Sequence, residues 1–222
     1  VSIAWSISSQ RSELKAQNIP INVLYENEDL LVVNKPVGMV VHPALGNWDG
    51  TLVNALMYHY PSCFALDDQN ERPGIVHRLD KDTTGVIVVA KNRQTLTELQ
   101  DAFAKREVVK DYLAIVHNRP QSGMISGLMK RHPRDRKRFA LQREGKESLS
   151  ICHALSHNQK QSLVWIRPKT GRTHQIRVHM RAVRCPIVGD QIYGIRKDDA
   201  PRQLLHAWRL DIPYRQTRIQ VE

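Results

Sequence analysis

The residues best suited to chemistry lie together in the segment His77-Arg-Leu-Asp-Lys-Asp-Thr-Thr-Gly85. Two carboxylates, two hydroxyls and three potential cations fall within nine residues, just before an apolar run at 86–90. This composition is typical of a polar loop beside a buried strand. Such a loop can carry an ionised carboxylate for nucleophilic or acid–base chemistry, or it can be a polar turn that feeds the strand.

The spacing of the two carboxylates argues against a calcium site. Asp80 and Gly85 match positions one and six of a calcium loop, but position twelve is Lys91, where a bidentate glutamate belongs. The pattern Asp80-x-Asp82-x-Thr84 also matches the nucleophile loop of aspartate-based phosphohydrolases. That chemistry needs the first aspartate at the end of an apolar strand, whereas here the strand follows it. A phosphohydrolase therefore remains a secondary alternative.

A second candidate segment, 169–180, combines a glycine turn with arginines and a helical pattern. The apolar spacing predicts a helix over 173–183, with Thr173 as its N-cap. Backbone N–H groups at a helix N-terminus, with Arg172 and Arg177 beside them, suit a phosphate or a carboxylate. The alternative is a solvated basic helix face.

The residues that could bind zinc have unfavourable spacing. His174 and His179 are five residues apart, not the four that place two ligands on one helix face. The cysteines Cys63, Cys152 and Cys185 form no CxxC pair, and an odd number is not a disulfide framework. We expect buried free thiols, no metal, and a reducing cytoplasmic compartment.

A third segment, 130–138, holds six Lys or Arg in nine residues and is called the basic segment below. Its proline and alternating charges predict a loop. The chain has 33 Lys and Arg against 22 Asp and Glu, a net charge of +11, which favours a polyanionic partner. The candidate phosphate contacts are Lys130, Arg131, Arg136 and Lys137. The alternative is a solvent-facing turn.

The rest of the chain supplies the elements that must position these segments. No apolar run approaches the ~18 residues of a membrane span, and the first 20 residues lack the pattern of a signal peptide. We expect a linker or the remnant of an upstream domain at 1–20 and one domain at 21–222. Strands outnumber helices, which predicts an α+β fold with a mixed, largely antiparallel sheet and flanking helices. The predicted elements are strands at 21–25, 30–34, 86–90, 108–116, 148–155 and 163–167, and helices at 51–60 and 94–105.

Six segments resemble, in the family's order, the RluA-type pseudouridine synthases. The resemblance covers about 21–213, and six blocks in order are far more specific than one. It implies the pseudouridine synthase fold with a central cleft, and isomerisation of uridine in structured RNA by a cytoplasmic monomer that needs no cofactor and no metal. The segments are 31–43, 77–85, 110–116, 171–180, 186–190 and 204–207.

Within that family, residues 46–56 and 131–138 are most similar to the large-subunit ribosomal synthase D branch. The implied partner is therefore large-subunit (23S) ribosomal RNA. Members of this branch usually carry an S4 RNA-binding domain before this region, so we expect the chain to be the catalytic domain alone. The segment between Tyr193 and Leu204 is shorter than expected, which leaves fine substrate preference open.

The resemblance assigns the catalytic roles. Asp80 is the catalytic carboxylate, which either forms a covalent adduct with the ribose or acts as a base on a route through a glycal. Burial favours the neutral form of a carboxyl group, whereas a neighbouring guanidinium favours the charged form. The resemblance gives that role to Arg177, with Arg172 as the alternative partner. Tyr112 stacks on the uracil or removes the C5 proton. Without the resemblance, Tyr112 would be an ordinary core tyrosine.

The resemblance also implies how the RNA is bound. A uridine in a stem-loop must be extruded, at a cost of roughly a few kcal/mol. Arg78 would fill the vacated stack, His77 would share that role or brace the loop, and Leu205 would lie beneath the base. Arg172, the basic segment and the arginine face of the helix would hold the backbone. A non-catalytic RNA-binding module is the rival, and it would tolerate changes at Asp80.

Overall fold

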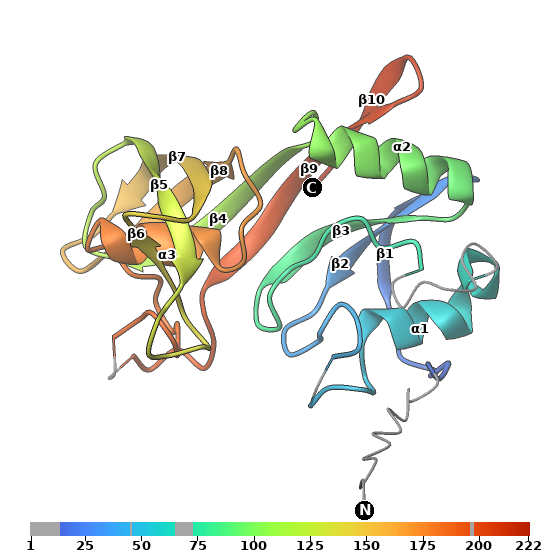
Figure 1. The fold of residues 1–222 in the computed structure, drawn as a ribbon, viewed down its shortest axis with the longest axis horizontal. Helices are drawn as coiled ribbons and strands as arrows, with labels where there is room; N and C mark the ends of the chain where they lie inside the picture. Colours follow the sequence, from blue (N-terminus) through green and yellow to red (C-terminus); the bar gives the residue numbers. More distant parts are fainter. Residues whose placement is uncertain (1–13, 45, 65–72, 196–197) are drawn as a thin grey trace, which may run out of the picture.

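The computed structural model describes residues 14–44, 46–64, 73–195 and 198–222 (Figure 1). Their strands form one sheet in the order β1-β2-β3-β9-β4-β8-β7-β5-β6, and β10 pairs with β9. The pair β3–β9 is parallel, and the other pairs are antiparallel. The predicted mixed, largely antiparallel α+β fold is confirmed. The elements are β1 (Asn22–Glu26), β2 (Leu30–Lys35), α1 (Leu52–His59), the 3-10 helix η1 (Pro61–Phe64), β3 (Thr84–Ala90), α2 (Arg93–Ala104), β4 (Val109–His117), β5 (Gly123–Arg131), β6 (Phe139–Gln142), β7 (Lys146–His157), β8 (Gln161–Pro168), α3 (Gln175–Ala182), β9 (Leu205–Tyr214) and β10 (Thr217–Val221).

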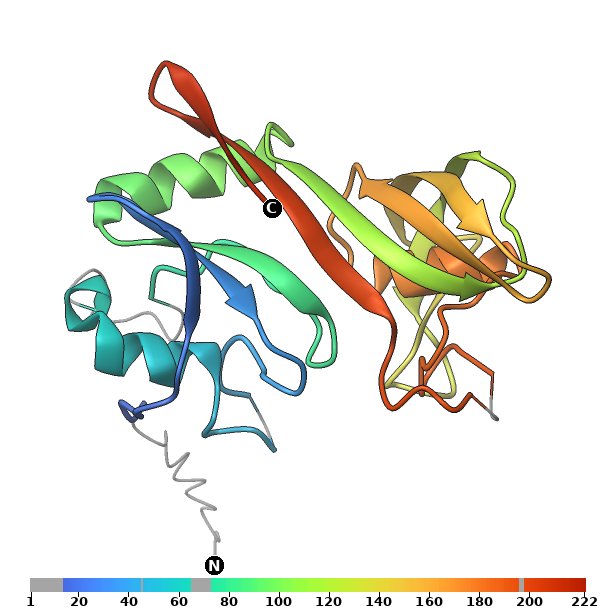
Figure 2. The ribbon, with the colours of Figure 1, turned by 180° about the vertical axis from the view of Figure 1, so that it is seen from behind.

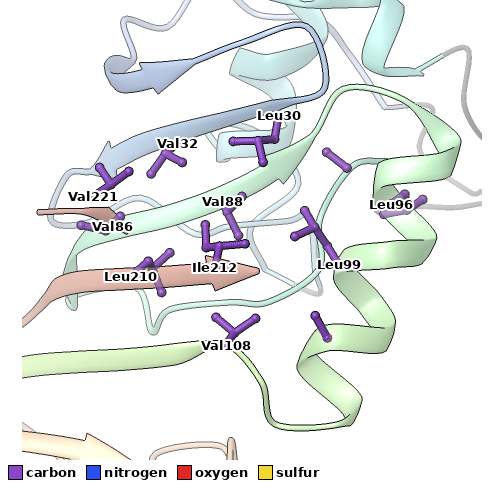
Figure 3. Close-up of a cluster of buried hydrophobic side chains, with 12 residues drawn as sticks. Leu30, Val32, Val86, Val88, Leu96, Leu99, Val108, Leu210, Ile212 and Val221 are labelled. Atoms are coloured by element: carbon purple, nitrogen blue, oxygen red, sulfur yellow. The ribbon is translucent and has the colours of Figure 1, made fainter. Parts of the chain in front are cut away.

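Two lobes divide the molecule, and the long strands β4 and β9 run from one to the other (Figures 1 and 2). In the first lobe, α2 covers one face of β2 and β3, and α1 covers the opposite face. Both strands are therefore buried on both sides, which explains the apolar runs at 30–33 and 86–90. Figure 3 shows the α2 side, where Leu96 and Leu99 meet Val88 and Ile212.

The second lobe is built on the outer strands of the sheet. Helix α3 packs its Ile176 and Met180 side chains against β4 and β8. Cys152 and Cys185 belong to this core and are free and buried, as predicted. The side chain of Cys63 lies outside the described residues.

Helix α1 lies within the predicted range 51–60, and it begins at a capping box that the sequence analysis did not identify. Thr51 accepts the Asn54 N–H through its hydroxyl, and the Asn54 side chain accepts the Thr51 N–H. Asn54 also binds the segment before β1, because its carbonyl oxygen accepts the Gln17 N–H. Leu14 and Ile19 pack on the α1 side of the core. Residues 14–20 thus lie against the first lobe, and the domain boundary at 20 stays a prediction.

Three local predictions were wrong. Thr173 is not the N-cap of α3, because His174 takes that position with a left-handed φ of 59° and no side-chain cap. The basic segment is not wholly a loop, since Lys130 and Arg131 belong to β5. The helix predicted over 173–183 is shorter at both ends, since α3 spans Gln175–Ala182 and Val183, 37% exposed, follows it.

Gly85 marks the point where the two lobes join. It has φ +115°, and an added Cβ would lie 2.1 Å from the Ala207 carbonyl oxygen of β9, its parallel neighbour. Both the backbone and the close approach therefore require glycine. We expect Gly85→Ala to lower the free energy of unfolding by about 3 kcal/mol or more. Urea unfolding measures this.

Gly123→Ala is the matched control for that substitution. Gly123 has φ +148° but nothing within 4 Å of the added Cβ. It should cost only about 1 kcal/mol, from backbone strain alone. Equal losses in the two variants would contradict the role given to the close strand approach.

Candidate active site

A cleft of about 530 Å³ lies between the two lobes. Its walls come from the loop before β3, the end of α2, β4, the turn between β8 and α3, and the start of β9. The cleft brings together seven of the predicted site residues, which are far apart in sequence. They are His77, Arg78, Asp80, Tyr112, Arg172, Arg177 and Leu205.

Asp80 lies on the loop that leads into β3. Buried Leu79 anchors the loop on one side, and the Thr83 N–H donates to the Asp80 carbonyl oxygen at 3.1 Å. The Asp80 side chain is 21% exposed, so its carboxylate reaches the cleft. Arg177 Nη1 donates to Asp80 Oδ2 at 2.8 Å. Within the described residues, Oδ1 accepts no hydrogen bond, so it is the oxygen open to a substrate.

Arg177 is held by a second carboxylate that the sequence analysis gave no role. Its Nε and Nη2 donate to the two oxygens of Asp190 at 2.7 and 2.8 Å. Burial lowers the pKa of Arg177, but Asp190, followed by Asp80, outweighs burial and raises it. Arg177 is therefore a permanent cation inside the ion-pair chain Asp190–Arg177–Asp80. It is only 5% exposed, so it does not belong to an open arginine face of α3.

Burial alone would raise the pKa of Asp190. The hydrogen bonds and charge of Arg177, helped by the Ile192 and Tyr193 N–H groups, outweigh burial and lower it. Both N–H groups donate to Oδ1 at 2.9 Å. Asp190 thus stays ionised and fixes the following turn. Its contact with Arg177 joins residues 13 positions apart, so no local sequence pattern pointed to this partner.

Lys35 supports the catalytic loop through hydrogen bonds, and the sequence analysis also gave this residue no role. It is fully buried, and its Nζ donates to the carbonyl oxygens of Pro36, Met39 and Lys81 at 2.8, 2.8 and 3.0 Å. Burial lowers its pKa to about 8, although Asp82 and Asp80 oppose that shift. Lys81 follows Asp80 directly, so this ammonium ties the β2 turn to the catalytic carboxylate's own loop.

The C-terminal side of the loop is tied to the segment that leads into β9. Gln203 Nε2 donates to Thr83 Oγ1 at 2.6 Å, and Thr84 Oγ1 lies 2.8 Å from His206 Nδ1. Leu205, between these two contacts, is 4% exposed and lines the cleft. Leu205, the apolar residue predicted to lie beneath the base, is thus next to the catalytic loop.

Tyr112 faces the cleft from β4 and is half-buried between two core clusters. Burial, reinforced by the charge of Asp80, raises its pKa well above the ordinary value. A phenol that resists ionisation is a poor proton acceptor. Tyr112 is therefore neutral near pH 7, and its two predicted roles, stacking on the base and proton removal, stay predictions.

His77 and Arg78 are neighbours with different environments. His77 Nε2 accepts the Val88 N–H at 3.0 Å, and its ring stacks on Phe103 at 4.8 Å. Burial, with Lys110 nearby, lowers its pKa to about 3, so it is neutral. Arg78 is exposed and lines the cleft. His77 is thus held against β3 and α2, whereas Arg78 is an exposed cation that lines the cleft.

A second hollow of about 570 Å³ adjoins the cleft and shares the turn 171–173 with it. Lys130, Arg131 and Arg172 line it, together with Lys146. Arg172 Nε donates to the Glu147 carbonyl oxygen at 2.9 Å. The remaining predicted contacts, Arg136 and Lys137, are exposed on the loop and line neither hollow.

Among the described residues there is neither a candidate metal site nor a helix able to span a membrane. No group of three or more His, Cys, Asp or Glu side chains there is arranged to hold a metal ion. None of the described helices has the length and apolar character needed to cross a membrane.

The sequence and the fold both match the pseudouridylate synthases, a class of RNA-modifying enzymes. The model of the RNA pseudouridylate synthase family matches residues 29–182. The chain belongs to this family. The human protein RNA pseudouridylate synthase domain containing 1 superposes with a TM-score of 0.76 and 30% identity, over 91% of this chain and 82% of that one.

Among named relatives, the chain is similar to ribosomal large subunit pseudouridine synthase D. It is 46% identical to the Xylella fastidiosa protein of that name over 83% of this chain and 55% of the relative. It is 45% identical to an uncharacterized RNA pseudouridine synthase of Aquifex aeolicus, over 87% of this chain and 62% of the relative. The chain thus spans between half and two thirds of the length of these curated relatives.

Proposed function

We propose that the chain isomerises uridine to pseudouridine in structured RNA, with large-subunit (23S) ribosomal RNA as its substrate. The observation that carries the proposal is Asp80, paired through Oδ2 with a buried guanidinium and open through Oδ1 to the cleft. The names of the synthase D relatives support the choice of RNA. Such a substrate also implies action in the cytoplasm, and a monomeric state remains our expectation.

The reaction needs an ionised carboxylate beside the ribose of an extruded uridine. The C1′–N1 bond breaks, the uracil turns, a C1′–C5 bond forms, and C5 loses its proton while N1 gains one. Arg177 keeps negative charge on Asp80 inside the cleft. Oδ1 either attacks C1′ or takes a ribose proton, and both routes use the same geometry.

The extruded uracil and the phosphate backbone of the RNA contact different surfaces of the protein. The uracil lies against Leu205 with Tyr112 beside it, and Arg78 occupies the stack that the uridine leaves. The phosphates follow the second hollow, whose cations come from β5 and the turn before α3. The two hollows adjoin, so one continuous strand can fill both.

The phosphohydrolase alternative conflicts with the charge at the site. A phosphohydrolase needs its carboxylate for Mg²⁺, whereas Oδ2 of Asp80 is already bound to Arg177. Incubating the purified chain with 23S ribosomal RNA and mapping pseudouridine by carbodiimide modification tests the proposal. New pseudouridines support it. Their absence, with phosphate released from a generic ester instead, contradicts it.

The basic segment gives a separate prediction about RNA affinity. Changing Lys130, Arg136 and Lys137 together to alanine should reduce the slope of log affinity against log salt by about two to three units, because each phosphate contact releases counterions. Filter binding of a stem-loop RNA at several salt concentrations measures the slope.

The matched control neutralises three exposed cations that lie outside the basic segment and line neither hollow, namely Arg93, Arg119 and Lys160. It changes net charge by the same amount and should leave the slope nearly unchanged. Equal slopes for the two triple variants would place the basic segment outside the RNA path.

A further inference from the structure

His174 stands between the catalytic carboxylate and the second hollow, and the mechanism above does not use it. Its Nε2 lies 3.9 Å from Asp80 Oδ2, and its Nδ1 lies 2.9 Å from the Tyr193 hydroxyl oxygen. The side chain is 17% exposed. Burial, the largest influence, lowers its pKa despite the charge of Asp80, so the ring is neutral near pH 7.

The hydrogen bonds of Tyr193 indicate which nitrogen of the ring carries the proton. The Phe139 N–H donates to the Tyr193 hydroxyl oxygen at 2.7 Å. The hydroxyl's own proton is then available to His174 Nδ1, the acceptor on its other side. A neutral imidazole that accepts at Nδ1 carries its proton on Nε2. That N–H is the one nearest the carboxylate.

The backbone of His174 supports a role in the site rather than in the helix. Its φ of 59° lies in the left-handed region, and its side chain does not cap α3. An ordinary N-cap is Ser, Thr, Asp or Asn with an extended backbone. A strained residue beside a reactive group is usually kept for what its side chain does there. Here the side chain lines the cleft.

Tyr193 connects this histidine to the basic segment. Phe139, its N–H donor, is the first residue of β6 and directly follows that segment. Arg138, the last residue of the basic segment, has its guanidinium 5.5 Å from the Tyr193 ring centroid. Arg177 lies 5.1 Å from the same centroid. The tyrosine therefore contacts both the expected RNA-binding surface and the ion pair at Asp80.

We propose that His174 is a positioning residue for Asp80, and that Tyr193 orients it and links it to the basic segment. The inference rests on the proposed function. Arg177 and His174 both face Oδ2, so they hold the carboxylate with Oδ1 toward the ribose. RNA that binds the basic segment fixes β6, and the hydrogen bonds through Tyr193 pass that constraint to His174, whose Nε2 lies 3.9 Å from Asp80 Oδ2.

The first test is Tyr193→Phe, which removes the hydroxyl and keeps the ring. The single-turnover rate at saturating stem-loop RNA should fall about tenfold, while the half-saturating RNA concentration stays within about twofold. Tyr214→Phe is the control, because it also loses a hydroxyl hydrogen bond, to Asp29, outside the cleft. It should keep the original rate.

The second test separates positioning from folding at His174. Glutamine can place its amide N–H where Nε2 lies, whereas asparagine reaches only the Nδ1 position but tolerates a left-handed backbone better. Positioning predicts that His174→Gln is faster than His174→Asn. A purely structural role predicts the opposite order. Thermal unfolding of both variants provides the comparison of stability.

The third test addresses the link to the basic segment. Arg136→Ala with Lys137→Ala should slow the saturated rate in the unmodified chain, but should cause no further loss in the Tyr193→Phe background. Additive effects would contradict the link. An unmodified chain that forms no pseudouridine contradicts the proposed function itself. An active chain with an equally fast Tyr193→Phe variant contradicts only the present inference.

Discussion

Asp80→Asn is expected to lower pseudouridine formation by at least about a thousandfold while the chain still binds RNA. The amide keeps the shape of the side chain and can still accept the Arg177 hydrogen bond. It cannot form the glycosyl adduct or take a ribose proton. Single-turnover assays on a stem-loop RNA measure the rate, and filter binding measures the affinity.

Asp82→Asn is the matched control for this prediction. Asp82 lies two residues away in the same loop and makes the same chemical change on substitution, but it does not line the cleft. We expect it to retain most activity. Substantial turnover by Asp80→Asn would contradict the mechanism. Equal loss of activity at both aspartates would mean that disturbance of the loop, and not loss of the Asp80 carboxylate, explains the effect.

The helices and most of the strands were predictable from the sequence because their apolar residues have a clear period. Helix α1, helix α2 and strand β3, which is buried on both faces, all lie where predicted. Strands β9 and β10 were not predicted, and strands β5 and β6 were missed as well. Several residues of β5 and β6 are exposed, and exposed strands lack the alternation on which the prediction depends. Only pairing with β7 and with each other fixes them.

The site was predicted through local motifs, and its missing members are those whose partners come from elsewhere in the chain. Asp80 and Arg177 were found because each lies in a dense polar motif. Asp190 and Lys35 make their contacts to groups 13 and 46 residues away, which no local pattern reveals. His174 was examined only as a zinc ligand. Its true surroundings depend on a left-handed backbone that helix propensity does not predict.

The ion-pair chain Asp190–Arg177–Asp80 explains why the fold tolerates these charges in a largely buried position. Two carboxylates and one guanidinium give the ion-pair chain a net charge of −1, and Asp80 is its only partly exposed member. A buried charge without a partner is strongly destabilising, whereas a paired and fully hydrogen-bonded one is not. Asp190 therefore serves both stability and function, since it neutralises the charge of Arg177 and holds the guanidinium in place for its hydrogen bond to Asp80.

Asp190→Asn should lower the free energy of unfolding by about 3 kcal/mol, because it removes one side of a buried ion pair. It should also slow pseudouridine formation, because Arg177 is no longer held in place. Asp111→Asn is the matched control: Asp111 is also buried and accepts two hydrogen bonds from one arginine, Arg167, but neither residue lines the cleft. It should cost stability and leave the rate of the folded enzyme nearly unchanged.

The pH dependence of stability gives an independent check on Asp190. Its pKa is lower in the folded chain than in the unfolded chain, so the stability it supplies is present above the unfolded pKa and is lost as the pH falls through the folded pKa. Asp190→Asn removes that contribution. Its free energy of unfolding should therefore fall less steeply below about pH 4 than that of the unmodified chain. If the free energies of unfolding of both chains fall equally steeply with pH in this acid range, Arg177 does not hold Asp190 ionised. The support for the catalytic carboxylate would then have to come from elsewhere.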